Sequence, residues 1–154
     1  MTAQAVSIRL AGAEDAAAVA PLFDAYRQFY DQPADPAGAG RFVLERLARQ
    51  ESEILIACDS EGWILGFCQL YPTFCSVEAK PIFSLYDLFV QPAHRRAGVG
   101  RRLLQAAETL ARQRGKARMD LTTARSNHAA QALYESLGWK RDDVFLAYSR
   151  SLGD

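Results

Sequence analysis

A chain of 154 residues that is 49% hydrophobic and 23% charged has the length and composition of a globular domain with a buried core. Its 18 basic and 18 acidic residues balance, so net charge gives no argument for a nucleic-acid partner or an anionic membrane surface. No apolar run approaches the roughly 18 residues of a membrane span, and the first residues lack the pattern of a signal peptide.

The cysteines and histidines argue against disulfides and against zinc. Cys58, Cys68 and Cys75 are odd in number and lack CxxC spacing, so we expect reduced thiols in a cytoplasmic protein. With only His94 and His128 as imidazole ligands, we expect no metal site.

The first third of the chain predicts a strand and two helices. Residues 6–11 alternate between polar and apolar side chains, which is typical of a strand. Apolar residues at helical spacing predict a helix over 12–30, whose first part we expect to be irregular because Pro21 interrupts it. A loop-rich stretch over 31–40 precedes a second helix around residues 43–48.

The rest of the chain predicts an antiparallel hairpin and then alternating strands and helices. The expected strands cover 53–58, 63–71, 82–90, 117–123 and 144–152, and the expected helices cover 98–115 and 127–138. This order predicts an α+β fold in a single domain over 1–154, with a mixed, mostly antiparallel sheet of about six or seven strands flanked by about four helices.

The segment RRAGVG joins the strand over 82–90 to the helix over 98–115. A helix N-terminus presents unpaired backbone N–H groups and a partial positive charge, both of which favour a phosphate. Gly98 and Gly100 would let the backbone approach such a ligand, and the arginines around them would donate charge-assisted hydrogen bonds. The alternative is a tight connection with solvated arginines, and the turn alone favours neither.

Two motifs give the chain a resemblance to a known family. LFVQPAHRRAGVG fits a Gln/Arg-x-x-Gly-x-Gly/Ala pattern after a strand, and NHAAQALYESLGW has an Asn at a helix start, a Tyr seven residues later and then a Gly followed by an aromatic residue. The matching positions are Arg95, Gly98, Gly100, Asn127, Tyr134, Gly138 and Trp139. The chain resembles the GNAT superfamily of acetyl-CoA-dependent N-acetyltransferases, which implies a GNAT-type fold.

The resemblance implies how acetyl-CoA would bind as a co-substrate. The strand before the turn would pair its backbone with the pantetheine arm, the amides of the turn would bind the pyrophosphate, and Asn127 and Tyr134 would lie near the thioester. The implied residues of the strand and the turn are Leu88, Phe89, Val90, Arg95, Arg96, Ala97, Gly98, Val99, Gly100 and Arg101.

Tyr134 would be the general acid that protonates the departing thiolate. A phenol with a pKa near ~10 is well matched to a thiol with a pKa of about 8.5 to 10. Tyr134 also lies on the apolar stripe of its helix, so the alternative is a core tyrosine with its hydroxyl at the rim.

Asp87 is the candidate base that takes the proton of the acceptor amine. An acidic residue among the apolar residues of a strand is costly to bury unless it has a partner or a function. The alternative is an aspartate that hydrogen-bonds a loop. Tyr30, Asp31 and Tyr71, together with Asp87, are the candidate substrate residues, because an acid among aromatic rings suits a small cationic amine. Packing and loop roles are the simpler alternative for these three.

The predicted function is therefore transfer of acetyl from acetyl-CoA to a primary amine, either a small amine or a polyamine-like or amino-acid-like acceptor, by direct attack in a ternary complex. No Cys or Ser is paired with a His as a covalent mechanism would need. We also expect a homodimer, and neither nucleic acid nor membrane as a partner. Two alternatives stay open: an acetyltransferase acting on a protein lysine or N-terminus, and a non-catalytic acyl-CoA-binding module on the same fold.

Overall fold

The computed structural model describes residues 5–153, and the chain divides into two compact units, residues 1–122 and 123–154. The first unit holds a sheet and three α-helices, and the second holds one α-helix and the C-terminal segment. Within the described residues, no helix has both the length and the apolar composition that a membrane span needs.

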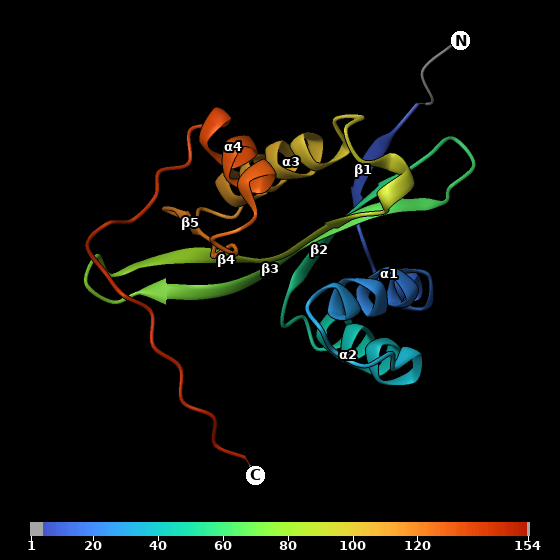
Figure 1. The fold of residues 1–154 in the computed structure, drawn as a ribbon, viewed down its shortest axis with the longest axis horizontal. Helices are drawn as coiled ribbons and strands as arrows, with labels where there is room; N and C mark the ends of the chain where they lie inside the picture. The colour runs from blue at the N-terminus through green and yellow to red at the C-terminus, as the bar shows by residue number, and fades with distance from the viewer. Residues whose placement is uncertain (1–4, 154) are drawn as a thin grey trace. The chain divides into compact units, whose positions relative to one another are not determined.

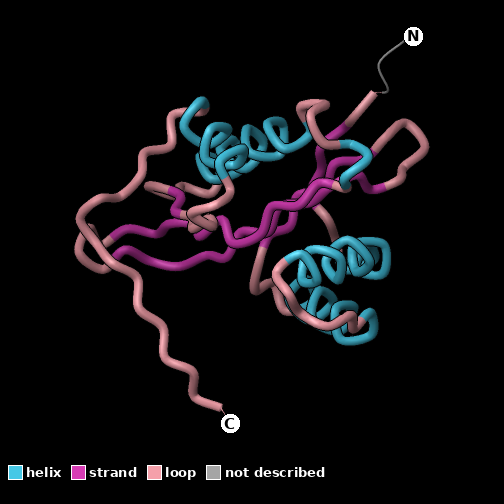
Figure 2. Tube along the Cα trace, viewed as in Figure 1, coloured by secondary structure: helices cyan, strands magenta, loops and turns pink. Residues whose placement is uncertain are grey.

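A five-stranded sheet forms the centre of the first unit, with its strands in the order in which they occur along the chain. The strands are β1 (Ser7–Leu10), β2 (Glu53–Cys58), β3 (Ile64–Cys75), β4 (Lys80–Val90) and β5 (Met119–Asp120). The first four pair antiparallel, and β5 adds parallel to β4, so the sheet is mixed and mostly antiparallel as predicted (Figure 2).

Helices cover both faces of this sheet. Figure 1 shows α1 (Ala16–Phe29) and α2 (Pro36–Ala48) on one face and α3 (Val99–Gln113) on the other. The core between the sheet and α1 is aromatic at its centre, where the ring of Phe67 lies 6.2 Å from that of Phe23 and 6.5 Å from that of Phe89. Phe67 is fully buried. The apolar stripe that predicted α3 is also buried, from Val99 to Ala111.

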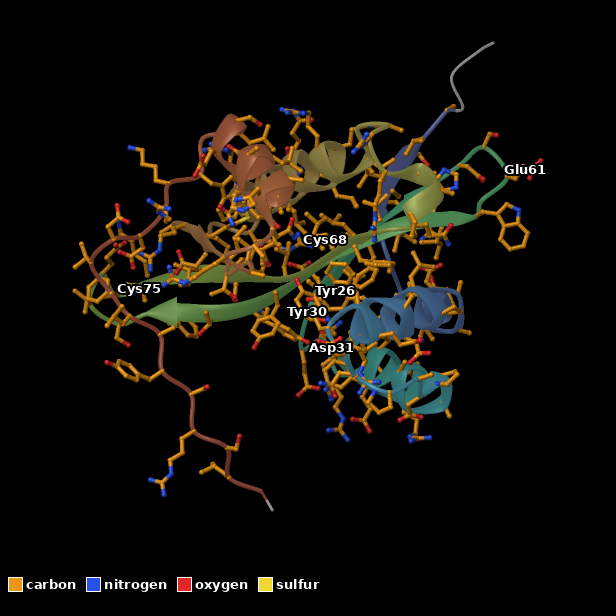
Figure 3. All side chains as sticks on the ribbon, in the orientation of Figure 1. Tyr26, Tyr30, Asp31, Glu61, Cys68 and Cys75 are labelled. Carbon is orange, nitrogen blue, oxygen red and sulfur yellow. The ribbon has the colours of Figure 1, made fainter. Side chains whose placement is uncertain are left out.

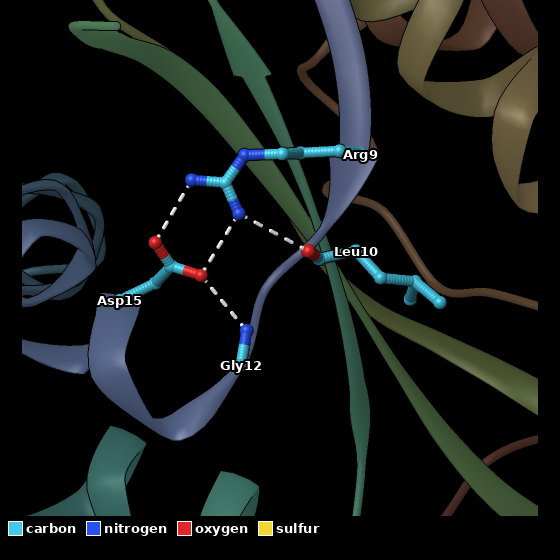
Figure 4. A network of polar contacts seen from close by, with 4 residues as sticks. All are labelled: Arg9, Leu10, Gly12 and Asp15. Carbon is cyan, nitrogen blue, oxygen red and sulfur yellow. Dashed lines mark hydrogen bonds and ion pairs between the residues drawn. The ribbon is translucent and has the colours of Figure 1, made fainter.

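An arginine–aspartate pair fixes the turn from β1 into the first helix (Figure 4). Both oxygens of Asp15 accept hydrogen bonds from the Arg9 guanidinium at 2.9 Å, and Asp15 Oδ2 also accepts one from the Gly12 backbone N–H at 2.8 Å. These hydrogen bonds to the charged form lower the pKa of Asp15. A short 3-10 turn, Ala13–Asp15, precedes α1, while Pro21 lies inside the α-helix, so the irregular start is present but does not arise at Pro21.

The second helix begins inside the stretch that the sequence predicts as a loop. Asp35 caps it by accepting a hydrogen bond from the Gly38 backbone N–H at 3.0 Å, and Pro36 occupies the first turn, where no amide hydrogen is needed. A Cβ at Gly40 would lie 3.7 Å from the Cβ of Ala20, so a small residue here lets α2 pack closely against α1. The loop prediction for 31–40 was therefore too long.

The strand predicted over 144–152 is absent, and the sheet has five strands instead of six or seven. The run of apolar residues that begins this segment is exposed, because no strand of the described residues pairs with it. Side-chain alternation predicts which face a strand would bury, but a strand forms only where a neighbouring backbone supplies hydrogen bonds. The strand predicted over 117–123 is likewise shortened to Met119–Asp120.

The second unit is built around α4 (His128–Ser136), as the sequence predicts. Asn127 caps it by accepting a hydrogen bond from the Ala130 backbone N–H at 3.2 Å. Beyond its end, Gly138 adopts the left-handed conformation that helix C-termini favour, with φ of 92°.

Candidate active site

The turn between β4 and α3 carries two residues with left-handed backbone. Arg96 has φ of 69° and Gly98 has φ of 81°, directly before α3 begins at Val99. Left-handed backbone strains a residue that has a Cβ, and such strain is concentrated at functional sites. Successive backbone N–H groups in this kind of turn form a concave, anion-binding surface, which the N-terminus of α3 extends.

The space beside Gly98 is open. A Cβ built on Gly98 would meet no protein atom within 4 Å, although the next residue, Val99, is buried and anchors the helix in the core. The side chains of Arg96, Ala97 and Arg101 are exposed around the turn. The turn therefore fits a pyrophosphate, because amide donors, arginines and an unfilled space meet at one helix start.

The side chain of Arg95 contacts the strand before this turn and the end of α1. Its Nε donates a hydrogen bond to the Val90 carbonyl at 2.9 Å, and its guanidinium lies 5.3 Å from the ring centre of Phe89 and 6.0 Å from that of Phe29. Cation–π contacts of this kind hold a guanidinium over an aromatic face. The Arg95 side chain thus links the end of β4 to the end of α1.

The C-terminal half of β4 has a strand on one side only. On that side β3 pairs with it through Val90, Phe89 and Leu88. On the other side β5 pairs with β4 only at Phe83 and Ser84, and no other strand of the described residues continues that pairing. The edge of β4 leading to the turn is therefore free of strand pairing, as backbone pairing with a pantetheine arm would require.

Asp87 lies on β4 within a row of buried polar side chains. It is 5% exposed and sits directly opposite Gln69 on β3. The Gln69 amide Nε2 donates a hydrogen bond to Asp87 Oδ2 at 2.7 Å, and the Ser52 hydroxyl donates one to Gln69 Oε1, also at 2.7 Å. The partner of Asp87 is thus a side chain of the neighbouring strand and not a loop.

The surroundings of Asp87 raise its pKa. Burial penalises the charged carboxylate and is the largest effect, while hydrogen bonds from Gln69 and Tyr26 act in the opposite direction. A carboxylate with a raised pKa holds a proton more tightly, which improves it as a general base near neutral pH.

Two tyrosines, Tyr26 and Tyr71, interact with this carboxylate, and further aromatic rings lie against them. Tyr26 donates a hydrogen bond through its hydroxyl to the Tyr86 carbonyl at 3.3 Å and packs its ring 5.2 Å from that of Tyr30. The ring of Tyr71 lies 5.4 Å from that of Tyr86, and burial, followed by the charge of Asp87, raises the pKa of Tyr71 to about 12. Tyr71 therefore stays a neutral phenol at physiological pH.

A register shift between β3 and β4 exposes Tyr86. Gln69 pairs with Asp87 while Leu70 pairs with Leu85, so Tyr86 is an extra residue in β4. Such a bulge twists a strand and redirects its side chains, and Tyr86 is accordingly exposed while Asp87 stays buried.

The structure thus brings together some of the predicted substrate residues. Tyr30 and Asp31 lie with Tyr26 at the C-terminal end of α1 (Figure 3), and Tyr71 lies against the ring of Tyr86, whose backbone carbonyl accepts the hydrogen bond from Tyr26. Asp31 is exposed, with a left-handed backbone at φ of 63°.

Two residues of this row were missed from the sequence. Gln69 stands in the apolar run ILGFCQLY, and a polar residue there signals a buried partner as Asp87 does in its own strand. Ser52 gives no such signal, because a serine before a strand is ordinary.

The second unit holds the other two predicted residues. Tyr134 is half-buried, and its ring lies 6.0 Å from that of Trp139. The Trp139 backbone N–H donates a hydrogen bond to the Tyr134 carbonyl at 3.1 Å, which closes the helix. Asn127 uses its side chain as the helix cap. Among residues 5–153, no group of three or more His, Cys, Asp or Glu side chains is arranged to hold a metal ion.

Known proteins resemble this chain over almost its whole length. It is 48% identical over 143 residues to the uncharacterized N-acetyltransferase YhfO of Bacillus subtilis (strain 168), covering 93% of this chain and 95% of that protein. It is 27% identical over 146 residues to the aminoglycoside N(6')-acetyltransferase type 1 of Stenotrophomonas maltophilia, covering 93% of this chain and 92% of that protein.

A solved structure of a probable acetyltransferase has the same fold, with a TM-score of 0.89 at 39% identity over 96% of this chain and 99% of that one. The model of the acetyltransferase (GNAT) family matches residues 19–139. The sequence motifs, the mixed sheet and these similarities agree, and the chain belongs to the GNAT family as an acetyl-CoA-dependent acyltransferase.

Proposed function

We propose that the protein transfers acetyl from acetyl-CoA to a small primary amine, which attacks directly in a ternary complex. The observation on which this proposal rests is the order of three features along β4. One strand contains the buried Asp87, then a stretch of unpaired edge, and it ends at the open turn around Gly98. A single rigid element would thus carry both the base for the amine and the start of the cofactor-binding turn.

Acetyl-CoA would supply an activated acyl carbon and a thiol leaving group. The turn from Arg96 to Arg101 would hold its pyrophosphate. The edge of β4 over Leu88, Phe89 and Val90, where the Val90 carbonyl has a partner, Arg95 Nε, and no second strand of the described residues pairs, would bind its pantetheine arm. The open space at Gly98 and the exposed arginines support this assignment.

Asp87 would accept the proton that the amine loses as its nitrogen bonds to the acyl carbon. Its raised pKa and its aromatic surroundings support a role toward a cationic acceptor, which would arrive protonated with a pKa near ~10. Tyr134 would donate a proton to the thiolate as the C–S bond breaks. Tyr30, Asp31 and Tyr71 would contact the acceptor.

A screen of candidate amines would identify the acceptor. The aminoglycoside acetyltransferase relative suggests polyamino sugars as one class to include, next to polyamines, amino acids, a lysine peptide and a peptide with a free N-terminus. Thiol release from acetyl-CoA, measured with each amine and checked by mass spectrometry of the product, tests the proposal. Acetylation of a small amine supports it, and acetylation of the peptides alone would replace it with protein modification. Release of no thiol with any amine, by a protein that binds CoA, would favour a binding module.

We also propose that the whole chain acts as one domain and forms a homodimer. The family model spans both compact units, which supports a single domain. The C-terminal segment supports the dimer, because Val144, Phe145, Leu146 and Tyr148 are apolar or aromatic and each at least 77% exposed. An extended apolar segment with unpaired backbone is a site for pairing with a second copy. The cytoplasmic location stays a prediction.

A further inference from the structure

Three buried polar side chains form a row across neighbouring strands. Ser52 lies directly before β2, Gln69 on β3 and Asp87 on β4, and their exposed fractions are 6%, 1% and 5%. Burying polar groups costs free energy unless each finds a partner, and here each hydrogen bond in the row is 2.7 Å long. Apolar side chains would fill the same space without needing hydrogen-bond partners. We therefore expect these three polar side chains to have a role in function.

The Asp87 carboxylate gives the row its direction. Because an ionised carboxylate only accepts hydrogen bonds, the amide nitrogen of Gln69 faces Asp87 Oδ2 and donates to it, and the Ser52 hydroxyl donates to the remaining Gln69 Oε1. If the amide were reversed, Oε1 would face a carboxylate oxygen, and two acceptors repel each other unless the carboxyl is protonated. The observed orientation therefore matches an ionised Asp87 and a reversed one matches a protonated Asp87.

Hydrogen bonds take the place of a counter-charge at Asp87. The ion pairs found in residues 5–153 do not include it. The ionisable groups near Asp87 are Tyr26 from α1, Cys68 and Tyr71 from β3, and Tyr86 from β4, with Arg46 and Glu51 acting on Tyr71. Burial, followed by the charge of Asp87, raises the pKa of Cys68, so this cysteine stays a neutral thiol. Among the hydrogen bonds that stabilise the Asp87 carboxylate, the one from Gln69 has a larger effect than the one from Tyr26.

We infer that Gln69 and Ser52 are positioning residues that hold the Asp87 carboxylate ionised and correctly oriented to accept the proton of the acceptor amine. This role rests on the proposed function of Asp87 as the base. Gln69 acts on the carboxylate directly, and Ser52 acts one step further away by donating to Gln69 Oε1, which strengthens the amide N–H as a donor.

The direct test follows the carboxyl carbon of Asp87 by ¹³C NMR during a pH titration, with the signal assigned by its absence in Asp87→Asn. In Gln69→Leu the pKa of Asp87 should rise by about one unit, as expected for loss of a hydrogen bond to a charged group. Ser52→Ala should raise it in the same direction and by less, because Gln69 Oε1 then loses its donor and the amide N–H becomes a weaker donor to the carboxylate. Ser52→Thr keeps the hydroxyl and should restore the wild-type value.

A matched control removes a hydroxyl elsewhere. Thr109 donates a hydrogen bond to the Gln105 carbonyl on the exposed face of α3, so Thr109→Ala should leave the titration unchanged. Ser52→Ala deletes a single oxygen, so it provides the test even if Gln69→Leu does not fold. An unchanged Asp87 titration in Ser52→Ala or in folded Gln69→Leu would overturn the inference and leave the proposed function intact.

The second readout is the pH dependence of kcat/KM for the acceptor amine. Its acidic limb should move to higher pH by the shift that NMR measures, while CoA affinity stays constant. If the NMR titration shifts and the rate profile does not, Asp87 is not the base, and the proposed role of Asp87 falls together with the positioning role.

Discussion

Replacing Gly98 with alanine tests the cofactor turn, and the structure separates its two effects. Because a Cβ at Gly98 meets no protein atom within 4 Å, the cost to folding comes only from the left-handed backbone at φ of 81°. Such a conformation costs a residue with a Cβ about 1–2 kcal/mol. For a domain of this size the melting temperature should fall by roughly 2–8 °C. The same Cβ would fill the space where the pyrophosphate is proposed to bind.

Gly115 is a matched control at the other end of the same helix. Its φ is 70°, and a Cβ there also meets no atom within 4 Å, so Gly115→Ala should lose a similar amount of stability. Calorimetric titration with CoA then separates strain from binding. Gly98→Ala should lose about tenfold or more in affinity, as expected when one or more charge-assisted hydrogen bonds are lost, and Gly115→Ala should bind as the wild type does. Equal affinities in the two variants would refute the assignment of the turn.

Four further predictions follow from the described contacts. Tyr134→Phe should keep CoA affinity and lower kcat by about 10²–10⁴ in a thiol-release assay, whereas a loss below threefold would make Tyr134 a packing residue. Burial raises the pKa of Asp87 above its unfolded value of about 3.9, so the stability that its proton provides is present below about pH 4 and lost as the pH rises through the folded pKa. Thermal melts from acidic to neutral pH should therefore show the Tm of Asp87→Asn rising relative to wild type, and a constant difference would contradict the shift. Phe67→Ala should lower the free energy of unfolding in urea by about 3–5 kcal/mol, because its ring is fully buried among three other aromatic rings. Light scattering of the wild type should show the proposed homodimer and that of Leu146→Asp a monomer, and a dimeric mass in both would exclude the C-terminal segment from the interface.

Local signals in the sequence predicted most of the elements. The apolar stripe of α3, the hairpin of β2 and β3, and the Asn127 cap of α4 depend on residues close together in the chain, and each is confirmed. The segment over 144–152 has the same quality of pattern and forms no strand. The difference is physical, because a helix satisfies its own backbone and a strand depends on a partner whose position the pattern does not contain.

The candidate site shows a similar division. The sequence already indicated Asp87, because an acidic residue is unusual within an apolar strand, and Gly98, because it belongs to the RRAGVG motif. The bulge at Tyr86 was not recognisable, since it arises from the register between two strands. The same register brings Gln69 opposite Asp87, so the row that ends at Ser52 becomes visible only when the strands are paired. Left-handed backbone at Arg96 was equally hidden, because an arginine carries no preference for it.

The central claim is that Asp87 serves the acceptor amine of an acetyltransferase whose cofactor binds at the turn after β4. The most direct measurement is kcat/KM of Asp87→Asn with the best acceptor amine across neutral to alkaline pH, with CoA affinity measured on the same preparation. The account predicts a loss of about 10²–10⁴ at neutral pH that shrinks as the pH rises, because solvent then supplies more of the free amine, while CoA affinity is retained. A rate within threefold of wild type at every pH, in a variant that still binds CoA, would contradict it.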